Sequence, residues 1–156
     1  MPVPPGQPVF QLPLTLEDVR PPVWRRQKVP GSVRLDKLHR MFQAAMGWED
    51  RHLHSFEIGG LRFGMHFDDF PDDEIDEKDA TVLRAIGDAR RFSYEYDFGD
   101  SWGHEVVVES LSRSPRGLKF GVCVDGQNAC PPEDCGGPPG YADLLEVLTD
   151  PTHDEH

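Results

Sequence analysis

Residues 91–111 read Arg-Phe-Ser-Tyr-Glu-Tyr-Asp-Phe-Gly-Asp-Ser-Trp-Gly-His-Glu-Val-Val-Val-Glu-Ser-Leu and contain two runs of alternating side chains. In the first run one face carries Phe92, Tyr94, Tyr96 and Phe98. In the second run one face carries Trp102, His104, Val106 and Val108. Two such runs around Gly99-Asp100-Ser101 predict a β-hairpin with an apolar face in the core. The turn also carries two carboxylates, an indole and an imidazole between Asp97 and His104, which makes it a candidate site.

The remaining patterns place further strands and helices around this hairpin. Alternation predicts a first strand within 9–19 and an edge or second strand over 23–29 after Pro21-Pro22. Helical spacing predicts a helix over about 33–46, with Ser32 as N-cap and Gly47 at its end. Runs at 52–58 and 61–66 predict a hairpin around Gly59-Gly60. With a short C-terminal helix at about 140–149, the fold class is α+β, a mostly antiparallel sheet of hairpins.

The length of 156 residues fits a single domain, 1–156, with three segments of unusual composition. Residues 1–7 are rich in proline and glycine and are expected to be loose. Residues 68–79 hold eight acidic side chains and predict an exposed acidic loop. They lack the alternating ligands and central glycine of a calcium loop. The Pro/Gly-rich stretch 125–140 predicts a shaped loop.

The formal net charge is −12, which disfavours non-specific binding to nucleic acid. The sequence contains neither an export signal nor an apolar run of the ~20 residues that span a membrane. The three cysteines are an odd number, which favours reduced thiols. Together these features predict a cytoplasmic protein.

Three groups of side chains could carry chemistry. Asp97, Asp100 and His104 fit an acid/base pair or metal ligands, and equally a turn in which the Asp side chains bind backbone amides. His52 and His54 could share a metal ion with His104 or Glu133, or could be structural. Cys130 and Cys135 lack the second pair of ligands that structural zinc needs, so they are a redox-labile pair or two reduced thiols in a fixed loop.

Several motifs occur together in one order: residues 20–26, 38–48 with 52–56, 94–104, and 130–137 with 140–141. With the Tyr-Glu-Tyr-Asp-Phe-Gly-Asp-Ser-Trp-Gly-His run and the Cys-Pro-Pro-Glu-Asp-Cys-Gly-Gly loop, the sequence resembles the plasmid pRiA4b ORF-3-like family over about residues 8–150. That family was first noted on a bacterial plasmid and also occurs beside insertion elements. The resemblance implies an α+β domain of a bacterial protein, and it implies no particular reaction, substrate or ligand. Family members often continue past the position of Pro151, whereas this sequence ends at His156.

Three functions are open at this level. The first is a non-enzymatic module that binds a protein or peptide. The second is a small metal-dependent or acid/base enzyme, with a divalent metal as its cofactor. The third is a DNA-associated accessory protein of a mobile element, which the net charge opposes. The first two require a common pocket, for which the candidate residues are His52, His54, Asp97, Asp100, Trp102, His104, Glu133, Asp134 and Tyr141.

Overall fold

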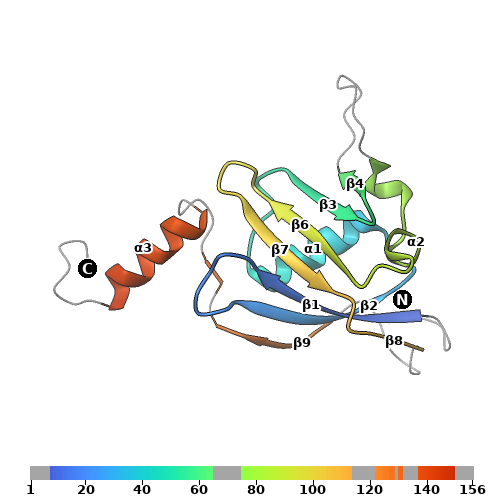
Figure 1. Cartoon of the computed structure of the whole chain (residues 1–156), viewed down its shortest axis with the longest axis horizontal. Helices are drawn as coiled ribbons and strands as arrows, with labels where there is room; N and C mark the ends of the chain where they lie inside the picture. The colour runs from blue at the N-terminus through green and yellow to red at the C-terminus, as the bar shows by residue number, and fades with distance from the viewer. Residues whose placement is uncertain (1–7, 65–74, 114–121, 129, 132–136, 150–156) are drawn as a thin grey trace, which may run out of the picture.

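The computed structural model describes residues 8–64, 75–113, 122–128, 130–131 and 137–149. They form an α+β fold in which the strands build one sheet, in the order β5-β4-β3-β6-β7-β1-β2-β9, with β8 beside β1 (Figure 1). The strands are β1 (Pro8–Leu16), β2 (Trp24–Pro30), β3 (His54–Ile58), β4 (Leu61–Gly64), β5 (Ile75–Asp76), β6 (Arg91–Tyr96), β7 (Trp102–Val107), β8 (Ser110–Arg113) and β9 (Val122–Gln127). The helical segments are α1 (Leu35–Met46), η1 (Glu77–Asp79), α2 (Val82–Ile86) and α3 (Gly137–Thr149). All strand pairs are antiparallel except β4 and β5.

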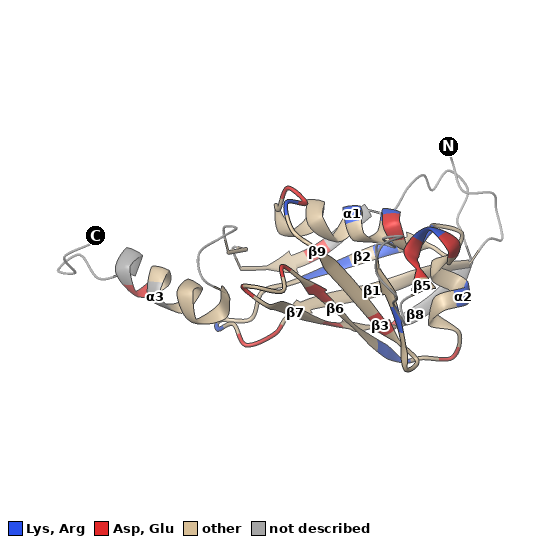
Figure 2. Ribbon diagram, turned by 90° about the horizontal axis from the view of Figure 1, so that it is seen from above, with Lys and Arg blue, Asp and Glu red and all other residues tan. Residues whose placement is uncertain are grey.

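Helix α1 covers one face of the sheet (Figure 2). Rows of cross-strand partners on that face are aromatic, because His54 lies opposite Tyr96, and Tyr96 lies opposite Trp102. Phe56, Tyr94 and His104 form the neighbouring row. The rings of this row are buried, and Phe42 of α1 packs edge-on against Tyr94 with ring centroids 5.2 Å apart. The predicted alternation of the central hairpin therefore builds the core.

The turn of the central hairpin differs from the prediction. Phe98 is 43% exposed and does not join the aromatic face. The chain leaves the strand at Asp97, which has φ +60°, and its Oδ1 accepts hydrogen bonds from the amides of Gly99 and Asp100 at 3.2 and 3.3 Å. This Asx-type turn breaks the alternation before Phe98.

The predicted helix over 33–46 and the hairpin at Gly59-Gly60 are confirmed. Gly47 ends α1 with φ +75°, a conformation that glycine adopts without strain. Ser32 is not the N-cap, because the chain first pairs with Thr81 at Arg34 and the helix begins at Leu35. The predicted second strand is β2, and it is not an edge strand because β9 pairs with its far side.

Of the predicted acidic loop, only residues 75–79 lie in the described part of the chain. Ile75 and Asp76 pair with β4, and Glu77 begins η1. Glu77 is 4% exposed, so the prediction of an exposed acid is wrong at this position. A buried carboxylate requires a partner, and that partner is a histidine described below.

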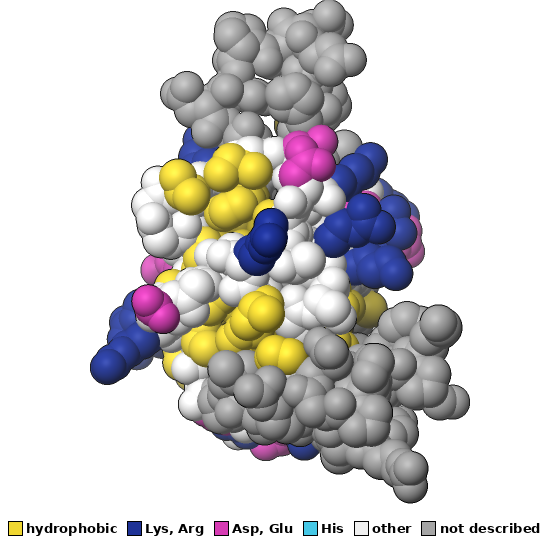
Figure 3. All heavy atoms as spheres, turned by 90° about the vertical axis from the view of Figure 1, so that its right-hand side faces the viewer, with side chains coloured by type: hydrophobic (Ala, Val, Ile, Leu, Met, Phe, Trp, Pro, Cys, Tyr) yellow, Lys and Arg dark blue, Asp and Glu magenta, His cyan; other side chains and the backbone are white. Residues whose placement is uncertain are grey.

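Figure 3 shows the end of the molecule that carries β4, β5 and α2, where apolar side chains gather on the surface. The exposed apolar residues of these three elements are Leu61, Ile75 and Leu83. Among the helices of the described residues, none combines the length and the hydropathy that a membrane span requires.

The start of α3 lies against the turn of the central hairpin. A Cβ placed on Gly137 would lie 2.2 Å from the carbonyl oxygen of Asp100, and Gly137 has φ +69°. We expect Gly137→Ala to lower the free energy of unfolding by about 1–2 kcal/mol through its left-handed backbone and by about 1–3 kcal/mol more through the clash. The matched control is Gly47→Ala, because Gly47 has φ +75° and nothing within 4 Å of its Cβ position. Equal losses for the two variants, measured by urea denaturation, would show that the contact with Asp100 is unimportant.

Candidate functional site

Two histidines and two carboxylates from four parts of the chain meet at one cavity. His39 lies on α1, Asp50 in the loop after it, His54 at the start of β3 and Glu77 in η1. The cavity has a volume of about 200 Å³. Its other lining residues are Asp36, Arg40, Asp76 and Lys78.

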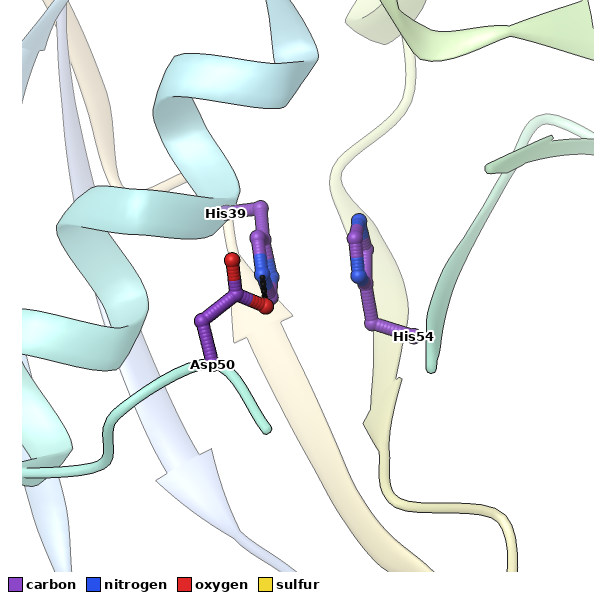
Figure 4. A group of neighbouring side chains, drawn as sticks. All are labelled: His39, Asp50 and His54. Atoms are coloured by element: carbon purple, nitrogen blue, oxygen red, sulfur yellow. Dashed lines mark hydrogen bonds and ion pairs between the residues drawn. The ribbon is translucent and has the colours of Figure 1, made fainter. Parts of the chain in front are cut away.

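The imidazole rings of His39 and His54 lie face to face (Figure 4). Their centroids are 3.4 Å apart and their planes differ by 6°. Each ring has its own carboxylate: His39 Nε2 lies 2.6 Å from Asp50 Oδ1, and His54 Nε2 lies 2.6 Å from Glu77 Oε2. The site therefore consists of two stacked histidine–carboxylate pairs.

Buried polar groups hold the His39 pair in place. His39 Nδ1 lies 2.7 Å from the hydroxyl of Tyr94, which also accepts a hydrogen bond from Gln43 Nε2 at 3.0 Å. The Oε1 of Gln43 accepts from the backbone amide of Asp50 at 2.9 Å. Asp50 has φ +57°, and this hydrogen bond fixes it in that uncommon conformation.

The two histidines differ in their electrostatic surroundings and in their hydrogen-bond partners. Burial lowers the pKa of His39, and neighbouring His54 lowers it further, against the opposing effect of Asp50. Burial also raises the pKa of Tyr94 well above its ordinary value, so its hydroxyl keeps its proton.

The Nδ1 of His54 is buried and has no hydrogen-bond partner among the described residues. An unpaired buried acceptor costs about 1–3 kcal/mol, so it calls for a partner.

Three of these residues could hold a metal ion. One ligand atom from each of His39, Asp50 and His54 lies within 4.8 Å of the other two. Among the described residues, no other group of three or more histidines, cysteines or acids has its ligand atoms this close together. Imidazole and carboxylate are the ligands of zinc, nickel, manganese and iron sites.

The structure does not bring the predicted metal set together. Of His52, His54 and His104, only His54 belongs to the group of close ligand atoms. His52 Nε2 lies 3.5 Å from Asp97 Oδ2, and its ring stands edge-on to Tyr96. His104 is fully buried, donates from Nδ1 to the carbonyl of Tyr94 at 3.1 Å, and packs edge-on against Trp48.

The other predicted site residues are divided between core, turn and undescribed segments. Trp102 and Tyr141 are buried in the core, at 0% and 5% exposure. Asp100 lies in the hairpin turn beside the start of α3. The remaining candidates, Glu133, Asp134 and Cys135, lie outside the described residues.

Cys130 and Pro131 contact the residues at the end of α1. Trp48 Nε1 donates to the carbonyl of Pro131 at 2.8 Å. The Sγ of Cys130 lies 3.0 Å from Arg25 Nη2 and 3.7 Å from the sulfur of Met46. Cys135, the predicted partner of Cys130, lies outside the described part of the chain.

A larger hollow of about 410 Å³ lies on the opposite face of the sheet, lined by outward side chains of β3, β4 and β6. Glu57, Glu95 and Glu17 contribute carboxylates there, and Arg62 contributes one cation. Burial raises the pKa of Glu17, and the nearby carboxylates Asp18, Glu105 and Glu95 add to the effect. These acids are spread along the strands and do not form a close ligand group among the described residues.

The buried His104 makes stability depend on pH. Burial lowers its pKa from 6.5 to about 4. Between these two values the unfolded chain binds a proton that the folded chain does not, so stability falls as the pH drops from 6.5 to 4 and levels off below that. The expected loss is roughly 3 kcal/mol.

Urea denaturation at a series of pH values measures this effect, with His104→Gln as the comparison. The variant should lose less stability over the same window, and part of the loss should remain because the pKa of His39 is also lowered. An identical pH dependence in the two proteins would contradict this account of His104.

Comparison with known proteins gives consistent matches over nearly the whole chain. The model of the family described as plasmid pRiA4b ORF-3-like protein matches residues 8–156. The uncharacterized protein y4hQ of Sinorhizobium fredii is 40% identical over 150 residues, which cover 95% of this chain and 77% of y4hQ. The crystal structure of MM3350, a protein of unknown function from Methanosarcina mazei Go1, superposes with a TM-score of 0.89 at 35% identity, covering 96% of this chain and 86% of that one. The sequence motifs, the fold and these matches agree, and the chain belongs to the plasmid pRiA4b ORF-3-like family.

Proposed function

We propose that this protein binds a divalent transition-metal ion in the pocket formed by His39, Asp50 and His54. The observation that carries the proposal is the convergence of one ligand atom from each of these residues within 4.8 Å. Nitrogen and oxygen ligands bind zinc at about 2.0–2.2 Å, so small side-chain movements would bring two of these ligand atoms into bonding range of one ion. Mixed imidazole and carboxylate ligands favour such ions over calcium or magnesium, which prefer oxygen alone.

The surroundings of His54 support the same proposal. Glu77 lies 2.6 Å from Nε2 and, as a carboxylate, can only accept, so the neutral imidazole of His54 has its proton on Nε2 and its lone pair on Nδ1. That lone pair is buried and has no partner among the described residues. Histidines that bind metals commonly donate their other N–H group to a carboxylate in this way.

The pocket also leaves room beside the ion. Structural zinc sites take four protein ligands, whereas this pocket offers at most three among the described residues, and its cavity of about 200 Å³ can hold water or a small ligand at the remaining positions. The proposal therefore develops the metal-dependent alternative of the sequence analysis. A peptide-binding surface built on Trp102 and Tyr141 has less support, because both side chains are buried.

Titration calorimetry of chelator-treated protein with Zn²⁺ tests the proposal. We expect saturable binding of about one ion per chain, weakened at least about tenfold in Asp50→Asn. Asp50 has a side chain 48% exposed, and asparagine tolerates its backbone conformation, so this variant should fold. The matched control is Asp88→Asn, an exposed acid that does not line the pocket. Absent binding in the wild type, or equal binding in Asp50→Asn and the wild type, would refute the proposal.

A further inference from the structure

The two stacked imidazoles differ in which ring nitrogen is hydrogen-bonded and to what. An assignment of their roles rests on the proposed metal site. We infer that His54 is the metal ligand, through Nδ1, and that His39 is a positioning residue whose Nε2–H holds the carboxylate of Asp50 toward the ion. The ligand set would then be His54 and Asp50, with the open positions left to water or a small ligand.

A closed ring of hydrogen bonds fixes the proton of His39. The backbone amide of Asp50 can only donate, so the oxygen of the Gln43 amide faces it and the Gln43 nitrogen faces Tyr94. The Tyr94 hydroxyl accepts from Gln43, and because it is fully buried its own proton requires an acceptor. His39 Nδ1, at 2.7 Å, is that acceptor. A neutral His39 consequently carries its proton on Nε2, which donates to Asp50 at 2.6 Å and closes the ring.

His54 carries the opposite kind of unpaired ring atom. Its Nε2–H is committed to Glu77, so a free lone pair remains on Nδ1, in a side chain that is 4% exposed and lines the cavity. His39 offers a donor where His54 offers an acceptor. A metal ion needs a lone pair, and of the two imidazoles in the ion-free pocket only that of His54 has one without a hydrogen-bond partner among the described residues.

The stacking of the rings leads to the same assignment. An imidazole binds a metal ion in the plane of its ring, along the lone pair of the nitrogen. The planes of His39 and His54 are within 6° of parallel, with centroids 3.4 Å apart. One ion cannot lie in both planes, so two-histidine coordination would require the stack to break. Coordination by His54 alone, with Asp50 as second ligand, leaves the stack and the hydrogen-bond ring intact.

Nitrogen-15 NMR of the wild-type protein tests the assignment through two-bond correlations between ring protons and ring nitrogens. Without metal we expect both histidines to show the Nε2–H tautomer. Addition of Zn²⁺ should shift the Nδ1 resonance of His54, while His39 keeps its proton on Nε2. A change of His39 to the Nδ1–H tautomer, or a zinc-induced shift centred on its Nε2, would overturn the assignment while leaving the metal site itself in place. No effect of zinc on either histidine would refute the proposed function instead.

Affinity measurements on three variants give an independent test. His54→Gln removes the ligand nitrogen and should lower Zn²⁺ affinity by more than about 100-fold, whereas His39→Gln keeps an N–H donor for Asp50 and should lower it about 10-fold. His52→Gln is the control, because His52 pairs with Asp97 outside the pocket, and its affinity should be unchanged. Melting curves establish that each variant is folded, and the NMR test applies if His39→Gln is not. A loss in folded His39→Gln as large as that in His54→Gln would overturn the positioning role.

Discussion

Replacement of Trp48 by alanine is expected to lower the free energy of unfolding by about 3–5 kcal/mol, which is the usual cost of removing a large aromatic side chain from a core. Trp48 is 5% exposed and stacks on Tyr96 with ring centroids 5.1 Å apart. It also contacts Trp102 at 5.7 Å, and its Nε1 donates to the carbonyl of Pro131. Trp48 therefore joins the end of α1, the central hairpin and Pro131. Urea denaturation measures the loss.

Two comparisons separate the contributions of Trp48. Trp48→Phe keeps an aromatic ring but removes the N–H donor to Pro131, which should cost about 0.5–1.5 kcal/mol from the hydrogen bond. Trp24→Ala removes the same kind of side chain from a partly exposed position on β2 and should cost less than Trp48→Ala. Equal losses for Trp48→Ala and Trp24→Ala would contradict the central place of Trp48 in the core.

Replacement of Glu77 by glutamine should weaken Zn²⁺ binding by about 10–100-fold, the usual effect of changing the carboxylate behind a metal-binding histidine. The carboxylate fixes the proton of His54 on Nε2, whereas an amide can donate to Nε2 and move that proton to Nδ1, where it blocks the ligand. Competition with a zinc-binding dye measures the affinity.

Glu57→Gln is the matched control for this change. Glu57 lies on the same strand as His54 but is exposed on the opposite face of the sheet, so its replacement should leave zinc affinity unchanged. If Glu77→Gln binds zinc as tightly as the wild type, the carboxylate does not prepare His54 for a metal ion.

The fold could be predicted from the sequence wherever apolar residues recur at regular strand or helix spacing and residues typical of turns follow them. The central hairpin, the hairpin at Gly59-Gly60 and α1 with its stop at Gly47 are of this kind. The errors lie where local hydrogen bonds override periodicity. Asp97 turns the chain before Phe98, and the pairing of Arg34 with Thr81 delays the start of α1 beyond Ser32.

The candidate site was less predictable, because its members come from four separate segments. His54 followed from its place on a strand of the predicted hairpin. The sequence does contain an indication of His39 and Gln43. Both fall on the apolar face of the predicted helix, where a buried polar side chain needs a hydrogen-bond partner. Their neighbours on that face are Leu35, Leu38 and Phe42.

Asp50 and Glu77 had no comparable signal. Asp50 lies in a polar loop, and Glu77 is one of many acids in an acidic stretch, so composition alone cannot show that it folds inward to His54. Only the packing of η1 beside the start of β3 distinguishes it from its neighbours. The pocket is a product of tertiary structure, and of its four members only His54 is predicted from the sequence.

The most direct measurement is the anomalous difference map of crystals grown with Zn²⁺, recorded at the zinc absorption edge. This account predicts one strong peak in the cavity between His54 and Asp50, within bonding distance of His54 Nδ1 and a carboxylate oxygen of Asp50, with His39 still stacked on His54. A peak beside His52 and Asp97 only, or no peak bound to protein at all, would contradict it.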